Sequence, residues 1–470
     1  MKKTTKRVLA FLLASTFVFS AMTAGVFAIA SYLNPNLGSS STSTYMSVNS
    51  VDDFIDLIKT SGNAFANIDE PEKHDATNKD VAPTIIIPGI SQSVSYLADE
   101  NGNPAVNANG EELSGGLLII DSSTLPGILA GTVAGPLVTS LLMQADMGLS
   151  DAVYETVTQV FSIQSSGVDG KATHNLQTYT YEYPISEMTQ DDRDYFYRMI
   201  PMKDVVDEIG GEDNLYFFTF PLISDPFISA AKLNDYIQIV KEQTGKDKVN
   251  IVTISLGGTI LTAYLELYKN TTYPDINKVL NVVSCLDGTD VMGDFYLRNF
   301  NLDDQFFFQE FLPMVMTEMN GYATLGHIIN IALKIFPRSV IEAILTAAVD
   351  GIIDTLMINC PQFWAMIPKD RYDDVINKYS FIKNDPEYSR LYATVEHFQQ
   401  ARLNLKDNLV KLNKQGALVH NVCGYNLDYS SQDYCFFAAM KSSLTTNSDA
   451  IIDIDSTSLG ATYAKAGEVL

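Results

Sequence analysis

The middle of the chain alternates between short apolar runs and segments with helical spacing. Apolar runs of strand length lie at residues 83–87, 214–220, 249–254, 278–285 and 417–424. Before the third run, Asp225-Pro226 and Gly245 are typical of the start and end of a helix. This order of strands and helices predicts an α/β fold, with a mostly parallel central sheet and helices on both faces.

The pattern changes between residues 299 and 404, where helical spacing dominates and no strand-like run occurs. Glu342, Asp350 and Asp354 interrupt this region too often for a transmembrane span. We interpret 299–404 as a helical cap inserted into a core formed by residues 51–298 and 405–470. Its apolar side chains fit a lipid-facing lid and helices packed on one another equally well.

The N-terminal segment has the features of an export signal. Residues 1–30 join a basic start to an uncharged run from Val8 to Ala30, and a small-x-small sequence precedes Ser31. Residues 31–50 are rich in serine and threonine and read as a flexible linker. The prediction is a secreted, extracellular protein, and the alternative is a protein anchored to the membrane by an uncleaved segment.

Composition narrows the classes of function. A hydrophobic content of 46% supports a large core, and a net charge of −25 disfavours nucleic acid and anionic membranes as partners. Cys423 and Cys435 could form a disulfide, but free buried thiols fit equally well. No Cys/His cluster has metal spacing and no Gly-rich phosphate loop occurs, so we expect neither a metal nor a cofactor.

Ser255 stands where an apolar run ends and a helical pattern begins, in the sequence Thr253-Ile-Ser-Leu-Gly257. This is the sequence of a nucleophile elbow, in which a sharp turn exposes a serine and small neighbours let strand and helix approach. Gly257 meets that demand, whereas Thr253 replaces the usual glycine. A buried strand followed by a Gly-rich turn without catalytic meaning is the alternative interpretation.

Several segments resemble the lecithin–cholesterol acyltransferase-like branch of lipases, within the α/β-hydrolase superfamily. They are residues 225–237, residues 244–252, Phe363-Trp-Ala-Met-Ile-Pro368 and Asn447-Ser-Asp-Ala-Ile-Ile452. The resemblance covers residues 80–460 patchily and is specific only over 225–262. Two departures are Pro221-Leu222, where the family has Trp-Arg, and Thr253-Ile254, where it has Gly-His.

The resemblance implies roles for individual residues. Ser255 would be the nucleophile and Asp449 the acid that orients the catalytic base. The amide of Leu256, with that of Ile90 or Ser91 after the Pro-Gly end of the first strand, would form the oxyanion hole. Other α/β-hydrolases place their acid directly after the strand at 417–424, which makes Asp428 the second candidate.

The expected catalytic histidine is missing from its usual place after the acid. The chain's five histidines are His74, His174, His327, His397 and His420, and all precede Asp449. Two explanations follow: the sequence lacks a last strand with its histidine, or the protein has lost hydrolysis and binds a ligand. We favour the first, since serine, elbow and acid would not all be expected to persist unused.

The sequence thus predicts a secreted serine hydrolase that acts on carboxylic esters, in particular lipid or acyl esters. Ser255 would form an acyl-enzyme, which water or another alcohol would release. The expected partners are a small-molecule ester or lipid and, through the cap, a lipid interface. An inactive binding protein on the same scaffold is the main alternative, and an amidase or peptidase is a further one.

Overall fold

A computed structural model describes residues 81–121, 123–271, 273–300, 336–425, 447–449 and 451–460. The predicted signal segment and linker lie outside these residues. So do Asp428, Cys435 and two of the five histidines, His74 and His327.

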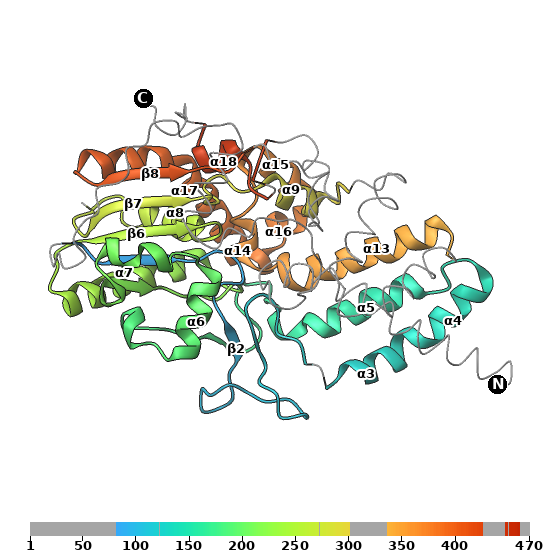
Figure 1. The fold of residues 1–470 in the computed structure, drawn as a ribbon. Coiled ribbons are helices and arrows are strands. Elements are labelled where there is room, and N and C mark those ends of the chain that lie inside the picture. The colour runs from blue at the N-terminus through green and yellow to red at the C-terminus, as the bar shows by residue number, and fades with distance from the viewer. Residues whose placement is uncertain are drawn as a thin grey trace, which may run out of the picture.

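The central sheet has five strands in the order β5-β1-β6-β7-β8, and every neighbouring pair is parallel (Figure 1). In chain order the strands are β1 (Thr84–Ile87), β5 (Leu215–Phe217), β6 (Val249–Ile254), β7 (Ile276–Val282) and β8 (Leu418–Val422). The predicted α/β fold with a parallel central sheet is therefore confirmed.

Helices cover the sheet on two sides, as the alternation of side chains in β1 shows. Ile85 and Ile87 belong to the larger core, which includes apolar side chains of α7 (Pro226–Thr244), α8 (Gly257–Leu267) and α17 (Ser389–Lys414). Ile86 faces the other way, into a smaller core around Phe196 of α6 (Gln190–Met199).

The predicted ends of helix α7 are confirmed in detail. The Asp225 side chain accepts a hydrogen bond from the Phe227 amide at 2.9 Å, and Pro226 occupies the first turn. At the other end Gly245 adopts φ +66°, a left-handed conformation that glycine reaches without strain.

A second, antiparallel sheet of three short strands follows β1. Its order is β3-β2-β4, with β2 at Ser95–Leu97, β3 at Ser114–Gly115 and β4 at Leu176–Thr178. The sequence between these strands is rich in turns, and its alternation is too short to predict them.

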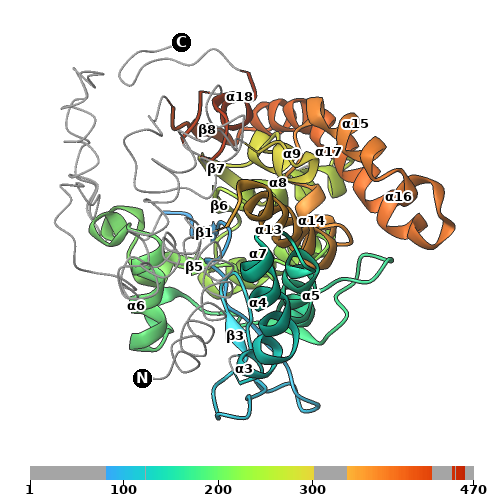
Figure 2. The same ribbon diagram turned by 90° about the vertical axis from the view of Figure 1, so that its right-hand side faces the viewer.

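Helices α3 (Leu125–Ile128), η1 (Leu129–Val133), α4 (Ala134–Met143) and α5 (Leu149–Phe161) extend away from the central sheet (Figures 1 and 2). Helix α13 (Arg338–Ile352) packs along α5. We call these five elements the helical projection. Residues 125–161 were not identified as a helical unit from the sequence.

The other short elements connect these layers. The helices are α9 (Asp290–Leu297), η8 (Ile353–Met357), α14 (Pro361–Trp364), α15 (Lys369–Lys378), α16 (Ser380–Asn384) and α18 (Ile454–Ser458). Short 3₁₀-helices occur at η2 (Ser162–Gln164), η3 (Ile185–Glu187), η4 (Lys203–Ile209), η5 (Glu212–Asn214) and η9 (Pro386–Tyr388). The division into core and cap at 299–404 stays a prediction, although α17 at its end packs on α8 of the sheet layer.

Every helix within the described ranges is too short or too polar to cross a bilayer.

Trp364 is the only tryptophan of the chain and is fully buried. Its indole Nε1 donates a hydrogen bond to the Ile358 carbonyl oxygen at 2.8 Å. The ring lies among Tyr296, Tyr372 and Tyr379, with centroid distances of 5.1 to 6.5 Å. This aromatic cluster fastens α14 to α9 and α15.

We expect Trp364→Ala to lower the free energy of unfolding by about 3–5 kcal/mol, because it leaves a large cavity and an unpaired carbonyl group. Urea denaturation followed by far-UV circular dichroism measures the change. Leu403→Ala is the matched control, since Leu403 is 61% exposed on α17, and it should cost less than about 0.5 kcal/mol. Equal losses for the two variants would contradict this assignment.

Candidate active site

Ser255 lies on a sharp turn between β6 and α8. Its φ of +48° is left-handed, which is unusual for a residue other than glycine. Its amide donates to the Val282 carbonyl oxygen at 3.2 Å, and its own carbonyl oxygen accepts from Gly258 and Cys285 at 3.0 and 2.8 Å. These backbone bonds hold the turn from both sides, and the Ser255 side chain is only half-buried.

Two glycines permit close contact between this turn and the end of β1. A Cβ atom on Gly257 would lie 2.4 Å from the Ile87 carbonyl oxygen, so no larger residue fits there without a backbone shift. A Cβ atom on Gly89 would lie 3.0 Å from the Cβ atom of Ser255. The segment after β1 therefore passes directly beside the predicted nucleophile.

The segment after β1 supplies the amides predicted for the oxyanion hole. The Gly89 amide is taken by the side-chain oxygen of Gln92 at 2.6 Å, and Gln92 Nε2 donates to Met199 O at 2.9 Å. Among the described residues, no acceptor engages the amides of Ile90, Ser91 or Leu256. Their role as an oxyanion hole stays a prediction.

Ser91 shows how this loop is held. Its φ is +60°, and its carbonyl oxygen accepts a hydrogen bond from the Tyr195 hydroxyl at 3.2 Å. Its own hydroxyl is buried and has no partner in the part of the chain that the structure describes. Sequence reasoning missed the supports Gln92 and Tyr195, because nothing in their local sequence separates them from other loop residues.

Thr253 occupies the position where the family has glycine, and its side chain is fully buried. Thr253 Oγ1 donates to Asn281 Oδ1 at 2.6 Å and lies 2.7 Å from Ser284 Oγ. Asn281 Nδ2 in turn donates to Asn421 Oδ1 at 2.8 Å. The threonine is thus accommodated because its hydroxyl joins a polar ladder across β6, β7 and β8.

Asp449 lies against the carboxyl end of β8. A Cβ atom on Gly424 would lie 2.4 Å from the Asp449 Cβ, and the carboxylate accepts from the amides of Ile451 and Ile452 at 3.0 and 2.7 Å. Burial raises the pKa of Asp449, although these amides oppose the shift. Ser255 follows β6, which is separated from β8 by β7 alone. The two residues therefore lie at the same edge of the sheet, with about 10 Å between their strands.

The three histidines within the described ranges make no contact with Ser255 or Asp449. His420 lies in the middle of β8 with an exposed side chain. His397 stacks on Phe227 with a centroid distance of 4.2 Å, and His174 pairs with Thr173. The base of a catalytic triad is therefore not assembled by these three residues.

None of the three cysteines within the described ranges contributes a reactive thiol to the site. Cys285, Cys360 and Cys423 carry free thiols, so Cys423 is not in a disulfide. Burial raises the pKa of Cys285 to about 12, which makes it inert as a nucleophile. Within the described ranges, no group of three or more His, Cys, Asp or Glu side chains could hold a metal ion.

The chain has no match among protein families or curated proteins and a weak one among solved structures. One similar solved structure is the crystal structure of the Tle4–Tli4 complex, which is 9% identical over 80% of this chain and 89% of that chain, with a TM-score of 0.30. A TM-score this low does not by itself establish a common fold.

We expect Gly257→Ala to lower the free energy of unfolding by about 1–3 kcal/mol, because the added methyl group would overlap the end of β1. Gly135→Ala is the matched control. Apart from the backbone of its own helix, no atom in the described part of the chain lies within 4 Å of a Cβ built there, so the better helix propensity of alanine should raise stability by about 0.5–1 kcal/mol. Thermal denaturation of both variants tests the prediction, and a neutral Gly257→Ala would refute the close approach.

Asp453, four residues after Asp449 in the sequence, should make the free energy of unfolding depend on pH. Its carboxylate accepts from the Asp290 amide at 2.8 Å, and burial raises its pKa to about 7, well above its ordinary value of 3.8. Between these values the folded protein keeps a proton that the unfolded chain has released. The free energy of unfolding therefore falls as pH rises through this window, by at most about 1.4 kcal/mol per pH unit.

The Asp453→Asn variant tests this dependence, because asparagine keeps the acceptor for Asp290 but does not titrate. Relative to this variant, the wild type should lose stability between about pH 4 and about pH 7 in urea denaturation. Asp455→Asn, an exposed carboxylate on α18, is the surface control. A difference between wild type and Asp453→Asn that does not change with pH would contradict the prediction.

Proposed function

We propose that this protein is a serine hydrolase of carboxylic esters with Ser255 as its nucleophile. The observation that carries the proposal is the turn itself. A strained serine stands between a parallel strand and the start of a helix, and two glycines bring the loop after β1 beside it. That arrangement is the nucleophile elbow of α/β-hydrolases.

In the proposed reaction Ser255 Oγ attacks the ester carbonyl carbon and passes its proton to a base. The negative charge on the carbonyl oxygen is stabilised by the amide of Leu256 with that of Ile90 or Ser91. Collapse of the tetrahedral intermediate expels the alcohol, which takes up the proton, and leaves an acyl-enzyme. Water or a second alcohol then attacks the acyl group and regenerates the Ser255 hydroxyl.

Asp449 is the proposed acid that orients the base. Its place at the end of β8 supports this role, since an imidazole between Asp449 and Ser255 would fill the separation of two strands. The proposed substrates are lipid or acyl esters, because the segment at 299–404, predicted to be a cap, is rich in apolar and aromatic side chains. Export directed by residues 1–30 would bring the enzyme to such substrates outside the cell.

A second function deserves a test because the three described histidines lie away from Ser255 and Asp449. On the same scaffold, the protein would bind an ester or lipid beside Ser255 without hydrolysing it. Without a base, the serine hydroxyl is a poor nucleophile near neutral pH. The two functions differ in whether the hydroxyl oxygen of Ser255 reacts with the bound ester.

A fluorophosphonate probe distinguishes them. The hydrolase should be labelled at Ser255, and Ser255→Ala should lose the label, as read by mass spectrometry of the modified peptide. Ser150→Ala, on the surface of α5, should leave labelling unchanged. So should His174→Ala, His397→Ala and His420→Ala, because none of these side chains reaches the site.

An ester panel completes the experiment. Turnover that increases with acyl-chain length supports lipid esters as substrates, whereas turnover of short soluble esters alone rejects them. Absence of both labelling and turnover in a protein that folds normally would reject the hydrolase and favour the binding function.

A further inference from the structure

Residues 122–145 carry no charged side chain, although 19% of the whole chain is charged. At that average, a segment of this length would carry about four or five charges. The nearest charged residues on either side are Asp121 and Asp146, and both are acidic. The segment forms α3, η1 and α4, the outer part of the helical projection.

Helix α4 buries one stripe and exposes the other. Val133, Leu137 and Ser140 face inward and are fully buried, in part against α5. Leu142 and Met143 at the end of α4 are 73% and 62% exposed, and Met147 in the following turn is 46% exposed. Three large apolar side chains therefore gather where α4 turns into α5, at the end of the projection away from the sheet (Figures 1 and 2).

The partner helix of the same hairpin is an internal comparison. The exposed positions of α5 include Asp151, Glu155 and Gln159, as expected for a helix that faces water. No Asp, Glu or Gln occupies an exposed position of α4, and the first such residue is Gln144, directly after the helix. The difference is specific to α4 and does not come from the projection as a whole.

The composition of the segment also disfavours a helix surrounded by water. Gly127, Gly131 and Gly135 lie on it, and apart from the local helix backbone no atom of the described residues lies within 4 Å of a Cβ built on any of them. Each glycine costs a water-exposed helix up to about 1 kcal/mol relative to alanine. Pro136 also removes one backbone donor, beside the π-helical turn η1. An apolar medium would favour the helix, because its backbone groups have no water to bond there.

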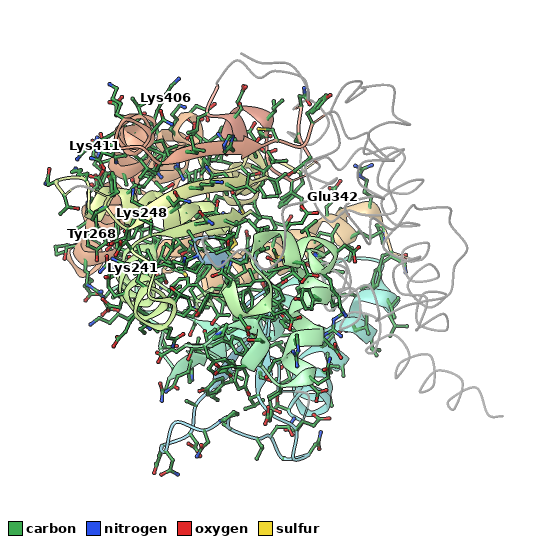
Figure 3. The ribbon with its side chains drawn as sticks, turned by 60° about the vertical axis from the view of Figure 1, so that its left-hand side comes forward. Lys241, Lys248, Tyr268, Glu342, Lys406 and Lys411 are labelled. Atoms are coloured by element: carbon green, nitrogen blue, oxygen red, sulfur yellow. The ribbon has the colours of Figure 1, made fainter. Side chains whose placement is uncertain are left out.

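We propose that α4 and the turn after it dock on the surface of an electrically neutral lipid bilayer, with Leu142, Met143 and Met147 inserted at the boundary of headgroups and acyl chains. The acidic flanks disfavour anionic lipids. Figure 3 shows Glu342 of α13, which belongs to the helical projection, at the opposite end of the molecule from four lysines: Lys241, Lys248, Lys406 and Lys411. These lysines are therefore too far away to attract anionic lipids to the docking surface. The proposal does not depend on hydrolysis by Ser255.

The single buried tryptophan makes a local test possible. In Met143→Trp, the introduced indole should be quenched by phosphatidylcholine vesicles that carry brominated acyl chains, while Trp364 stays shielded in the core. Leu403→Trp is the matched control, because Leu403 is 61% exposed but lies on α17. We expect quenching at position 143 and none at position 403. Equal quenching, or none at 143, would overturn the proposal.

Binding by the full chain provides the second measurement. Leu142→Glu should weaken flotation with phosphatidylcholine vesicles by about tenfold or more, whereas Leu403→Glu should not. Vesicles of phosphatidylglycerol should bind less wild-type protein, and Asp146→Lys should reduce that difference. Stronger binding of the wild type to phosphatidylglycerol would refute a neutral surface.

Two further outcomes separate this proposal from its competitors. Ser255→Ala should float as the wild type does, so a failure of fluorophosphonate labelling leaves the docking result intact. A second copy of the chain is the competing occupant of α4. If the wild type is a dimer by light scattering, becomes a monomer in Leu142→Glu and does not bind vesicles, the surface is an interface between copies.

Discussion

The structure depends on two backbones that meet without a side chain between them. The end of β1 and the start of α8 touch at Gly257, where even a methyl group would overlap the Ile87 carbonyl oxygen. This contact forces Ser255 into a left-handed conformation and lifts its side chain out of the sheet. A Cβ atom on Gly89 would lie 3.0 Å from the Ser255 Cβ, so the loop that carries Ile90 and Ser91 passes beside the same turn. The strained serine thus lies where two segments distant in the sequence come into contact.

Buried polar groups then fix the position of α17 and the register of the strands, which apolar packing alone would not specify. On one side of the sheet, Arg402 of α17 is buried and donates to the carbonyl oxygens of Ala365 and Ile367. Glu266 of α8 accepts from Asn404 and Asn408 of the same long helix. Beneath Ser255, the ladder that starts at Thr253 joins three strands in register. Unpaired, these groups would be costly to bury, so they specify one position of α17 and one alignment of the strands.

Features set by local chemistry could be predicted from the sequence. The ends of α7 follow from Asp225, Pro226 and Gly245, and the parallel sheet follows from the alternation of apolar runs with helices. Helices η1 and α4 of the projection could not be predicted, because their glycines and proline have poor helix propensity and packing on α5 supports them. The neighbours of Ser255 and Asp449 come from distant parts of the chain, such as Gln92 and Gly424. No local sequence pattern predicts contacts between residues that lie so far apart in the chain.

The order of the strands also determines when the sheet can form. Strand β1 is made first but lies between β5 and β6, which follow more than a hundred residues later. At synthesis rates of about 5–20 residues per second, Ile85, Ile86 and Ile87 would wait for roughly 6–26 s before their first partner strand exists. During that time they remain an unpaired apolar segment at the start of a growing chain. Until β5 has been synthesised, this apolar segment is therefore open to aggregation rather than protected by strand pairing.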